Sequence, residues 1–318
     1  MASLLPLAVL AATVSGVPLQ AETPSAAAAV GYNVNTFSAD FNRSNVDLSA
    51  SGKPGFQWYL WNLFGYHANP AAVVLNTDQS VTLLGDKINP DSEIMTATPA
   101  HNAARFVGTA FGGGAYIEAE FKFNPDDVAW AAYMKSSGWP SFWALPIESC
   151  IFRSDHWPKQ PPGYVHAVEV DFFEYLYFHM GEGPRHAYGG SMHDWYGIPN
   201  VTCPHGSCEE PMRSDEPKRF ANKDIDFKRY HRFGFLWVPA KPGKPGYARF
   251  LLDGKPMGSD RAWTQYTDQP PTPHNQPWLF GVLDQQHLIL ILGTGPNQPM
   301  TIRSVNVWQS SAAQNLHQ

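Results

Sequence analysis

The sequence predicts an all-β fold, a β-jelly roll built as a sandwich of two large antiparallel sheets, and three observations support this. The 318 residues include 28 Pro and 26 Gly, and these turn residues separate many short apolar runs. The runs have the length and the Val, Ile, Phe and Tyr content of β-strands. No long segment has the apolar spacing of an amphipathic helix. With 43% hydrophobic residues the chain can form one sizeable core, so we expect one domain.

Alternation along the chain identifies the strands. In the run 116–123, Ile117 and Phe121 fall on one face, which we expect to be buried. Tyr116, Glu118 and Glu120 fall on the other face, which we expect to face solvent. Further strands are predicted at 232–239, 248–257, 287–292 and 303–309.

Turns and loops connect these strands. The pair Asp253-Gly254 lies between two extended runs and predicts a two-residue hairpin, because both turn positions need a positive φ. The segments 155–164 and 179–217 are predicted to be long surface loops, and 240–246 an exposed connection between strands. Loops of this length on a rigid sheet usually shape a binding site.

The first residues predict secretion. An apolar stretch from Leu4 to Val14 is too short to span a bilayer, so we interpret residues 1–21 as a cleaved signal peptide and 22–318 as the mature domain. The protein is then expected to be secreted and extracellular. Asn42 and Asn200 lie in Asn-x-Ser/Thr sequons and are predicted glycosylation sites.

The chain has three cysteines. In an oxidising compartment Cys203 and Cys208 could form a disulfide that closes a tight loop, which leaves Cys150 unpaired. His205 lies between the pair, so a zinc site is the alternative interpretation, although a second close Cys pair is absent.

Charge and composition limit the partners. The formal net charge is −6 and the sequence has no run of Lys or Arg, so neither nucleic acid nor a membrane surface is an expected partner. Aromatic residues make up 14% of the chain, with 11 Trp, whereas charged residues make up only 16%. Flat aromatic rings suit a sugar-binding groove, and a thick aromatic core is the alternative explanation.

Three acids lie in the most strand-like segment, AVEVDFFEY at 167–175. Strand alternation places Glu169 and Asp171 on one face and would turn Glu174 to the other. A β-bulge near Phe172-Phe173 would return Glu174 to the first face. We therefore predict three carboxylates on one sheet face, separated by a bulge.

Such a cluster costs stability, because like charges repel one another and resist desolvation. Retaining glycoside hydrolysis needs two carboxyl groups, a nucleophile and an acid/base, about 5–5.5 Å apart. Glu169 and Glu174 could reach that separation, with Asp171 between them biasing their ionisation. The alternatives are a solvated strand face and a calcium site.

The segment EVDFFE resembles the E-x-D-x-x-E signature of glycoside hydrolase family 16, in its laminarinase-like and agarase-like branches. The segments FGGGAYIEAEFKF, GWPSFWALP, FGFLWVPAKPGKPGYARFLLDGKPM and SVNVWQ are similar to further strands of that family. The resemblance implies a concanavalin A-like jelly roll with a substrate groove across its concave sheet. It also implies that Glu169 is the nucleophile, Asp171 the assisting residue and Glu174 the acid/base.

The resemblance extends to residues that would contact sugar. Trp139 and Trp143, in GWPSFWALP, are similar to an aromatic floor, and His193, in SMHDWYG, matches a histidine on a neighbouring strand that contacts sugar in many members. A structural hydrogen bond is the alternative role for His193. Trp195 is a further candidate for a sugar contact, whereas Trp58, Trp61 and Trp130 could belong to the core or to the groove rim.

The expected function is that of a secreted, monomeric, retaining endo-β-glycosidase without a cofactor or catalytic metal, with a slightly acidic pH optimum. The expected substrate is a β-linked polysaccharide: β-1,3-glucan first, then mixed β-1,3/1,4-glucan, then a galactan. A non-catalytic, lectin-like glucan-binding protein and a transglycosylase are the alternatives. A serine hydrolase would need a nucleophile elbow, and GGSMH at 189–193 lacks its second Gly.

Overall fold

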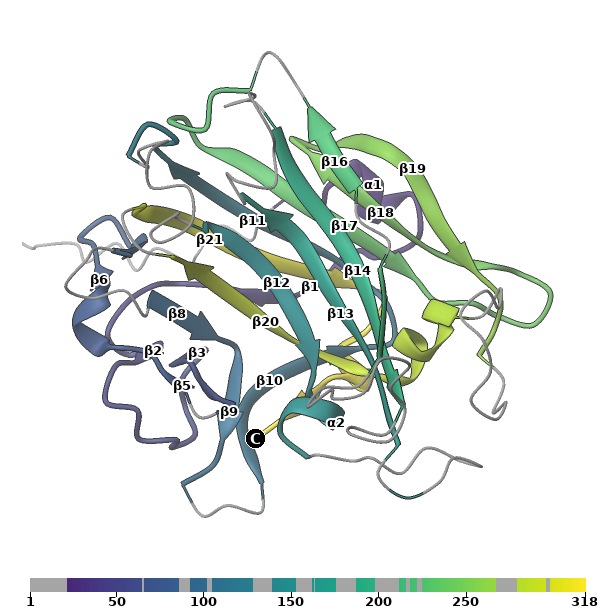
Figure 1. Cartoon of the computed structure of the whole chain (residues 1–318), viewed down its shortest axis with the longest axis horizontal. Helices are drawn as coiled ribbons and strands as arrows, with labels where there is room; N and C mark the ends of the chain where they lie inside the picture. The colour runs from purple at the N-terminus through teal and green to yellow at the C-terminus, as the bar shows by residue number, and fades with distance from the viewer. Residues whose placement is uncertain are drawn as a thin grey trace, which may run out of the picture.

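The computed structural model describes residues 22–64, 66–85, 92–101, 105–127, 139–152, 162, 164–175, 187–197, 212–215, 218–221, 225–266, 279–295 and 298–318. Within them the chain forms two large β-sheets that pack face to face (Figure 1), which confirms the predicted sandwich. The predicted signal peptide, residues 1–21, lies outside the described residues. So do Asn200, Cys203 and Cys208, and the glycosylation and disulfide assigned to them stay predictions.

The first sheet has eight strands, all antiparallel, and β1 pairs with β21 beside the main path. In order across the sheet, these are β19 (Lys255–Trp263), β18 (Gly246–Leu252), β17 (His231–Val238), β11 (Ala115–Phe123), β21 (Met300–Gln309), β7 (Val81–Leu83), β6 (Val73–Leu75), with β1 (Val34–Ser38).

The second sheet has twelve strands and carries the three acids. Its main path is β15 (Met212–Asp215), β14 (Ala187–Gly197), β13 (Val165–Glu174), β12 (Ser141–Pro146), β20 (His287–Thr294), β8 (Ser92–Met95), β3 (Trp58–Leu60), β2 (Val46–Asp47). Beside this path lie β16 (Lys218–Ala221), β10 (Phe106–Gly112), β9 (Ala97–Pro99) and β22 (Leu316–His317). A separate hairpin joins β4 (Asn62–Leu63) to β5 (Tyr66–His67).

Helical segments in the described part of the chain are short. They are α1 (Ser25–Ala28), α2 (Ile147–Cys150), η1 (Pro70–Ala72), η3 (Leu279–Gln285) and η4 (Ala312–Gln314). Among the residues described, no helix has the length and hydrophobicity that crossing a membrane requires.

The predicted turn chemistry is confirmed and one loop prediction is wrong. Asp253 and Gly254 have φ values of 49° and 75° and join β18 to β19. In contrast, the segment 179–217, predicted to be loop, contains β14 and β15. The inward residues of β14 include Tyr188 and Met192, each 1% exposed, so the segment has the alternation of a strand. Its other face is polar and Gly-rich, which made it resemble a loop.

Aromatic rings fill the space between the sheets. Phe173 of β13 lies 4.9 Å from Phe121 of β11 and 4.4 Å from Phe233 of β17, measured between ring centroids. Phe172 lies 4.9 Å from Phe235 of β17 in the same way. Tilted and edge-on ring pairs at these distances are favourable, and each buried ring removes a large apolar area from water. The strand with the acids is therefore also central to the core.

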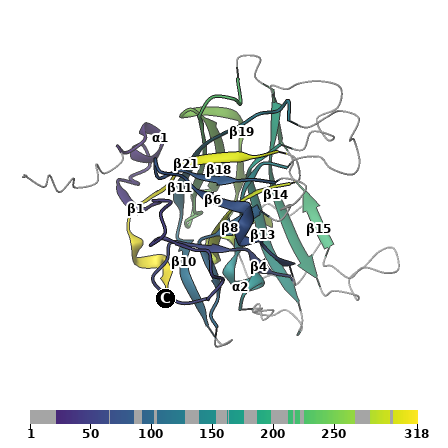
Figure 2. The same cartoon turned by 90° about the vertical axis from the view of Figure 1, so that its left-hand side faces the viewer.

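The outer face of β11 is not solvated as predicted. Tyr116 is fully buried, because Ala27 and Tyr32 from the segment around α1 pack against it, and Glu118 is only 5% exposed. Figure 2 shows α1 on the side of the molecule opposite β15. The Tyr116 hydroxyl donates to Glu118 Oε2 at 2.7 Å. Burial raises the pKa of Glu118, and the bond from Tyr116 only partly offsets this.

Candidate active site

A β-bulge in β13 sets the direction of the acids. On β12, Phe142 pairs with Phe173 and Trp143 pairs with Asp171, so Phe172 is an extra residue in β13. Phe172 and Phe173 are 1% and 0% exposed, and both enter the core. Two consecutive residues on one face restore the next side chain to the opposite face. The predicted bulge is therefore confirmed, at the predicted position.

The pairing with β14 shows what faces each acid. Glu169 pairs with His193 and Asp171 with Ser191, whereas Glu174 pairs with Gly189 after the bulge. Directly paired residues in an antiparallel sheet lie on the same face. Glu169 and Glu174 are partly exposed on this face, and Asp171 between them is only 2% exposed.

Hydrogen bonds fix each carboxylate. Trp195 Nε1 donates to Glu169 Oε2 at 2.9 Å. Asp171 Oδ2 accepts from the Ser191 hydroxyl at 2.9 Å and lies 2.9 Å from His193 Nε2. The three acids thus have neutral or positive donors on β14, which reduces the cost of their proximity.

Glu174 is bound from two sides. Trp139 Nε1 donates to its Oε1 at 3.1 Å, and the Ser191 hydroxyl lies 3.2 Å from its Oε2. A hydroxyl has one proton, and that of Ser191 contacts both Asp171 and Glu174. Ser191 can therefore hydrogen-bond to both residues only when one of the two carboxyls is protonated and donates to the Ser191 oxygen.

The electrostatics favour such a retained proton. Burial, and then the charge of Asp171, raise the pKa of Glu169 to about 8 and that of Glu174 to about 7. The bond from Trp195 partly offsets the rise for Glu169, and the bonds from Trp139 and Ser191 do so for Glu174. Because the two carboxyls interact, they titrate as a pair that holds one proton near neutral pH. A general acid needs a raised pKa of this kind.

The same side chains are also the described residues that could ligate a cation. Ligand atoms of Glu169, Asp171 and His193 lie within 4.8 Å of one another. His193 Nε2 and Asp171 Oδ2 already contact each other at 2.9 Å, so a cation would have to replace that contact. We assign no metal to the site.

The predicted tryptophans surround the acids. Trp139 is 45% exposed and bonds to Glu174, and Trp195 bonds to Glu169. Trp143 shares the face of Asp171 and lies 5.5 Å from Trp61, measured between ring centroids. Of the tryptophans whose place was left open, Trp58 and Trp61 are buried in the core, Trp61 at 6% exposure and in contact with Trp143, and Trp130 is outside the described residues.

Sequence analysis missed Ser191 as a site residue. Ser191 lies two residues before His193 and four before Trp195, so strand alternation places all three on one face. That signal was present in the sequence once His193 and Trp195 were assigned to the site. Ser191 sits in the middle of β14 with its hydroxyl bonded to carboxylates, which is unlike the strand-to-helix turn of a serine hydrolase nucleophile.

Two other predicted features have a described place. Asn42 is partly exposed, and its Oδ1 accepts from the backbone N–H and the hydroxyl of Ser44, the third sequon residue. Cys150 has a free, buried thiol, and burial raises its pKa. A thiol in this state is a poor nucleophile.

Comparison with known proteins supports the fold. No protein-family model matches the chain, and no curated protein matches its sequence. Among solved structures, the endo-1,3-β-glucanase from Streptomyces sioyaensis matches with a TM-score of 0.51 and 15% identity, over 90% of this chain and 97% of that one. The chain therefore has the concanavalin A-like sandwich fold of that glucanase.

Weaker structural matches include a lectin and a lyase. The winged bean acidic lectin, in complex with methyl-α-D-galactose, matches with a TM-score of 0.35 and 9% identity, over 86% of this chain and 97% of that one. Alginate lyase vAL-1 from Chlorella virus matches with a TM-score of 0.36 and 10% identity, over 84% and 99%. Likenesses this low carry no argument about function.

Proposed function

We propose that the protein is a retaining endo-β-glycosidase of glycoside hydrolase family 16. The observation that carries this proposal is the bulge at Phe172, which aligns Glu169, Asp171 and Glu174 on one sheet face with hydrogen-bond partners on β14. A strand designed for stability alone would not gather three carboxylates there. The raised pKa values of Glu169 and Glu174 further support a pair that retains one proton for acid catalysis, without deciding which of the two carries it.

In the first step Glu169 attacks the anomeric carbon of a β-linked sugar. The bond to the leaving oxygen breaks as Glu174 donates its proton to that oxygen, and a glycosyl ester forms on Glu169. In the second step Glu174, now ionised, takes a proton from water, which attacks the anomeric carbon and releases Glu169. Two inversions retain the configuration.

The neighbouring residues serve the carboxylates. Trp195 orients the attacking carboxylate through its N–H, and Trp139 does the same for Glu174. Asp171, held by His193 and Ser191, keeps a negative charge close to both acids and so raises their pKa values. Trp143, in the same face, is placed to cover a sugar ring.

The substrate we propose first is β-1,3-glucan. The shared fold with the endo-1,3-β-glucanase from Streptomyces sioyaensis supports this order by analogy. Mixed β-1,3/1,4-glucan and galactan follow. Small residues flank Glu174 in the row across the sheet, Gly189 on one side and Ser141 then Gly293 on the other. The row is low beside Glu174, and at Gly293 the side chain of Glu93 lies over it, 2.9 Å from the position of a Cβ.

The test is release of reducing ends from β-glucans and β-galactans by the wild type and by Glu169→Gln. We expect activity on β-1,3-glucan that falls by at least about a thousandfold in the variant, because no other group can form the ester. Glu120→Gln is the matched control, since Glu120 lies on the other sheet and pairs with Arg303 at 3.2 Å. Activity retained by Glu169→Gln would refute the role of Glu169.

The same assay separates the alternatives. A lectin-like protein would bind the polymer in both forms and release no ends from either. A transglycosylase would form longer products when an oligosaccharide acceptor is added, because acceptor and water compete for the same ester. We further propose secretion after removal of residues 1–21, and glycosylation at Asn42 and Asn200, which mass spectrometry of the secreted protein would test.

A further inference from the structure

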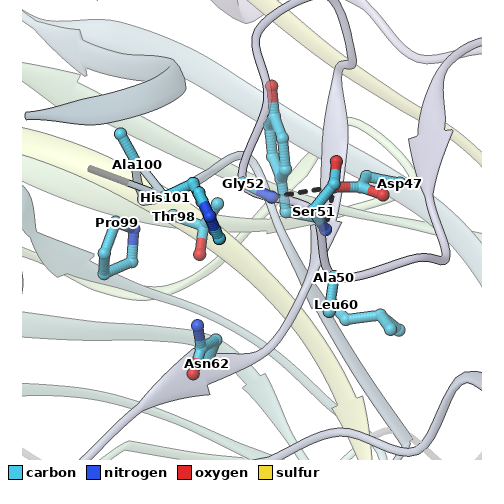
Figure 3. Close-up of a pocket in the computed structure, with 11 residues that line it drawn as sticks. Asp47, Ala50, Ser51, Gly52, Leu60, Asn62, Thr98, Pro99, Ala100 and His101 are labelled. Carbon is cyan, nitrogen blue, oxygen red and sulfur yellow. Dashed lines mark hydrogen bonds between the residues drawn. The ribbon is translucent and has the colours of Figure 1, made fainter. Parts of the chain in front are cut away.

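A cavity lies away from the acids, at the edge of the same sheet, with a volume of about 210 Å³. Two stretches of the chain line it: 47–62, which includes the loop after β2 and strands β3 and β4, and 98–101 at the end of β9. Figure 3 shows Thr98, Pro99 and His101 close together, with Asn62 below them and Leu60 to the right. β3 is four strands from β13, so the two sites lie roughly 19 Å apart at about 4.8 Å per strand.

Three polar side chains in this cavity have unused hydrogen-bonding capacity. Within the described residues, the side chains of Asn62, Thr98 and His101 make no hydrogen bond, although Thr98 is only 4% exposed. Each side chain can both donate and accept. Polar groups that converge on a cavity without protein partners are satisfied by water or by a ligand.

The lining offers no free charge. Asp47 is 1% exposed, and its carboxylate accepts five hydrogen bonds, from the backbone and hydroxyl groups of Ser49 and Ser51 and from the backbone of Gly52. These donors use its lone pairs, so Asp47 is not available to a cation. Its negative charge also disfavours an anion.

The walls are rigid before any ligand binds. Hydrogen bonds from Ser49, Ser51 and Gly52 to Asp47 fix one wall. The backbone N–H of His101 donates to the backbone carbonyl of Gly52 at 3.3 Å and so joins the two walls. Gly52 has a φ of 56°, and a Cβ there would lie 3.0 Å from the Pro99 carbonyl oxygen. A preformed cavity binds without an ordering cost.

We propose that this cavity is a second carbohydrate-binding site, which takes one uncharged pyranose unit of a polysaccharide. Hydroxyl groups of the sugar would pair with Asn62, Thr98 and His101, and its C–H face would contact Leu60 and Pro99. The proposal rests on the proposed function for the class of ligand. A polymer held here would be retained by the protein while another part of it is cleaved at the acids.

The experiment titrates a β-1,3-linked glucose trisaccharide into the Glu169→Gln protein by isothermal calorimetry. We expect two sites per chain. Thr98→Val removes one hydroxyl at constant shape, and combined with Asn62→Ala and His101→Ala it should weaken one of the two sites by at least about tenfold. Trp143→Ala should weaken the other. His317→Ala, a matched exposed histidine bonded to Thr109, is the control.

Activity gives a second measurement. The triple variant should hydrolyse a short oligosaccharide at the wild-type rate and insoluble glucan more slowly. Equal binding by the triple variant and its parent would overturn the proposal, whereas a single site that the triple variant weakens would leave it standing and count against binding at the acids. A trisaccharide containing glucuronate that binds the cavity as tightly as the neutral one would contradict its uncharged character. Calorimetry reports on the cavity even if no hydrolysis is found, so the two proposals fail separately.

Discussion

Replacement of Trp195 by Phe tests the role of Glu169, because it removes a single hydrogen-bond donor, the indole N–H. The variant keeps a ring of similar shape and loses the N–H that donates to Glu169 Oε2 at 2.9 Å. This bond lowers the pKa of Glu169, so its loss should raise a pKa that already lies at about 8. The carboxylate form, which attacks the sugar in the proposed mechanism, then becomes rarer.

The size of the effect follows from the bond. A hydrogen bond to a charged group contributes about 1.5–3 kcal/mol, and one pKa unit corresponds to about 1.4 kcal/mol. The pKa of Glu169 should therefore rise by roughly one to two units. Below both pKa values, kcat/KM is proportional to the fraction of molecules with ionised Glu169. It should fall there by roughly 10- to 100-fold.

The assay is the pH dependence of kcat/KM on a soluble β-1,3-glucan. The wild type should show a bell with limbs near the two raised pKa values, close to neutral pH rather than slightly acidic as the sequence suggested. Trp139→Phe is the matched variant, because it removes the same kind of bond from Glu174. It should leave the acid side of the profile unchanged.

The outcome that would refute the reasoning is a reversal between the two variants. If Trp139→Phe lowers kcat/KM on the acid side and Trp195→Phe does not, Glu174 is the nucleophile and Glu169 the acid. Equal effects of both variants at every pH would mean that the N–H groups act only on packing. Thermal unfolding of both variants checks that the fold is intact.

Three further predictions concern the scaffold. Phe173→Ala should lower the free energy of unfolding by about 3–5 kcal/mol in urea titrations, since it empties the centre of the inter-sheet core; a loss below about 1 kcal/mol would contradict this packing. Because the folded-state pKa of Glu118 is raised, its ionisation destabilises the fold as pH rises through that pKa, so Glu118→Gln should increase the Tm at pH 8 and have little effect at pH 4. Hydrogen bonds lower the pKa of Asp47 despite its burial, so Asp47→Asn should reduce the Tm at pH 7, and this difference should shrink as pH falls below the ordinary range of Asp; an unchanged Tm would contradict either assignment.

Local patterns predicted the features that depend on neighbouring residues. Strand alternation would turn Glu174 away from the face of Glu169 and Asp171, and this was enough to predict the bulge. The pair Asp253-Gly254 was enough to predict its hairpin. Both follow from short-range backbone geometry. Strand alternation could equally have identified Ser191, since His193 and Trp195, two and four residues after it, were already assigned to the site.

Features built from distant segments could not be predicted in this way. Alternation in its own strand places Tyr116 on the face expected to meet solvent, and its burial depends on Ala27 and Tyr32 from the segment around α1. The cavity at the sheet edge combines residues 47–62 with 98–101, and only the pairing of the strands brings them together. Polarity also misled the prediction for β14, because the polar face that suggested a loop is the face used by the site.

The aromatic core beneath the acids has a consequence for how such a protein can change during evolution. Phe172 and Phe173 tie the backbone of β13 to two strands of the opposite sheet, β11 and β17, so a mutation that shifts the acids also disrupts the core and is removed by selection for folding. Residues outside this core, such as the 45% exposed Trp139, carry no such folding penalty. Substrate preference is therefore free to diverge while the chemistry stays in place.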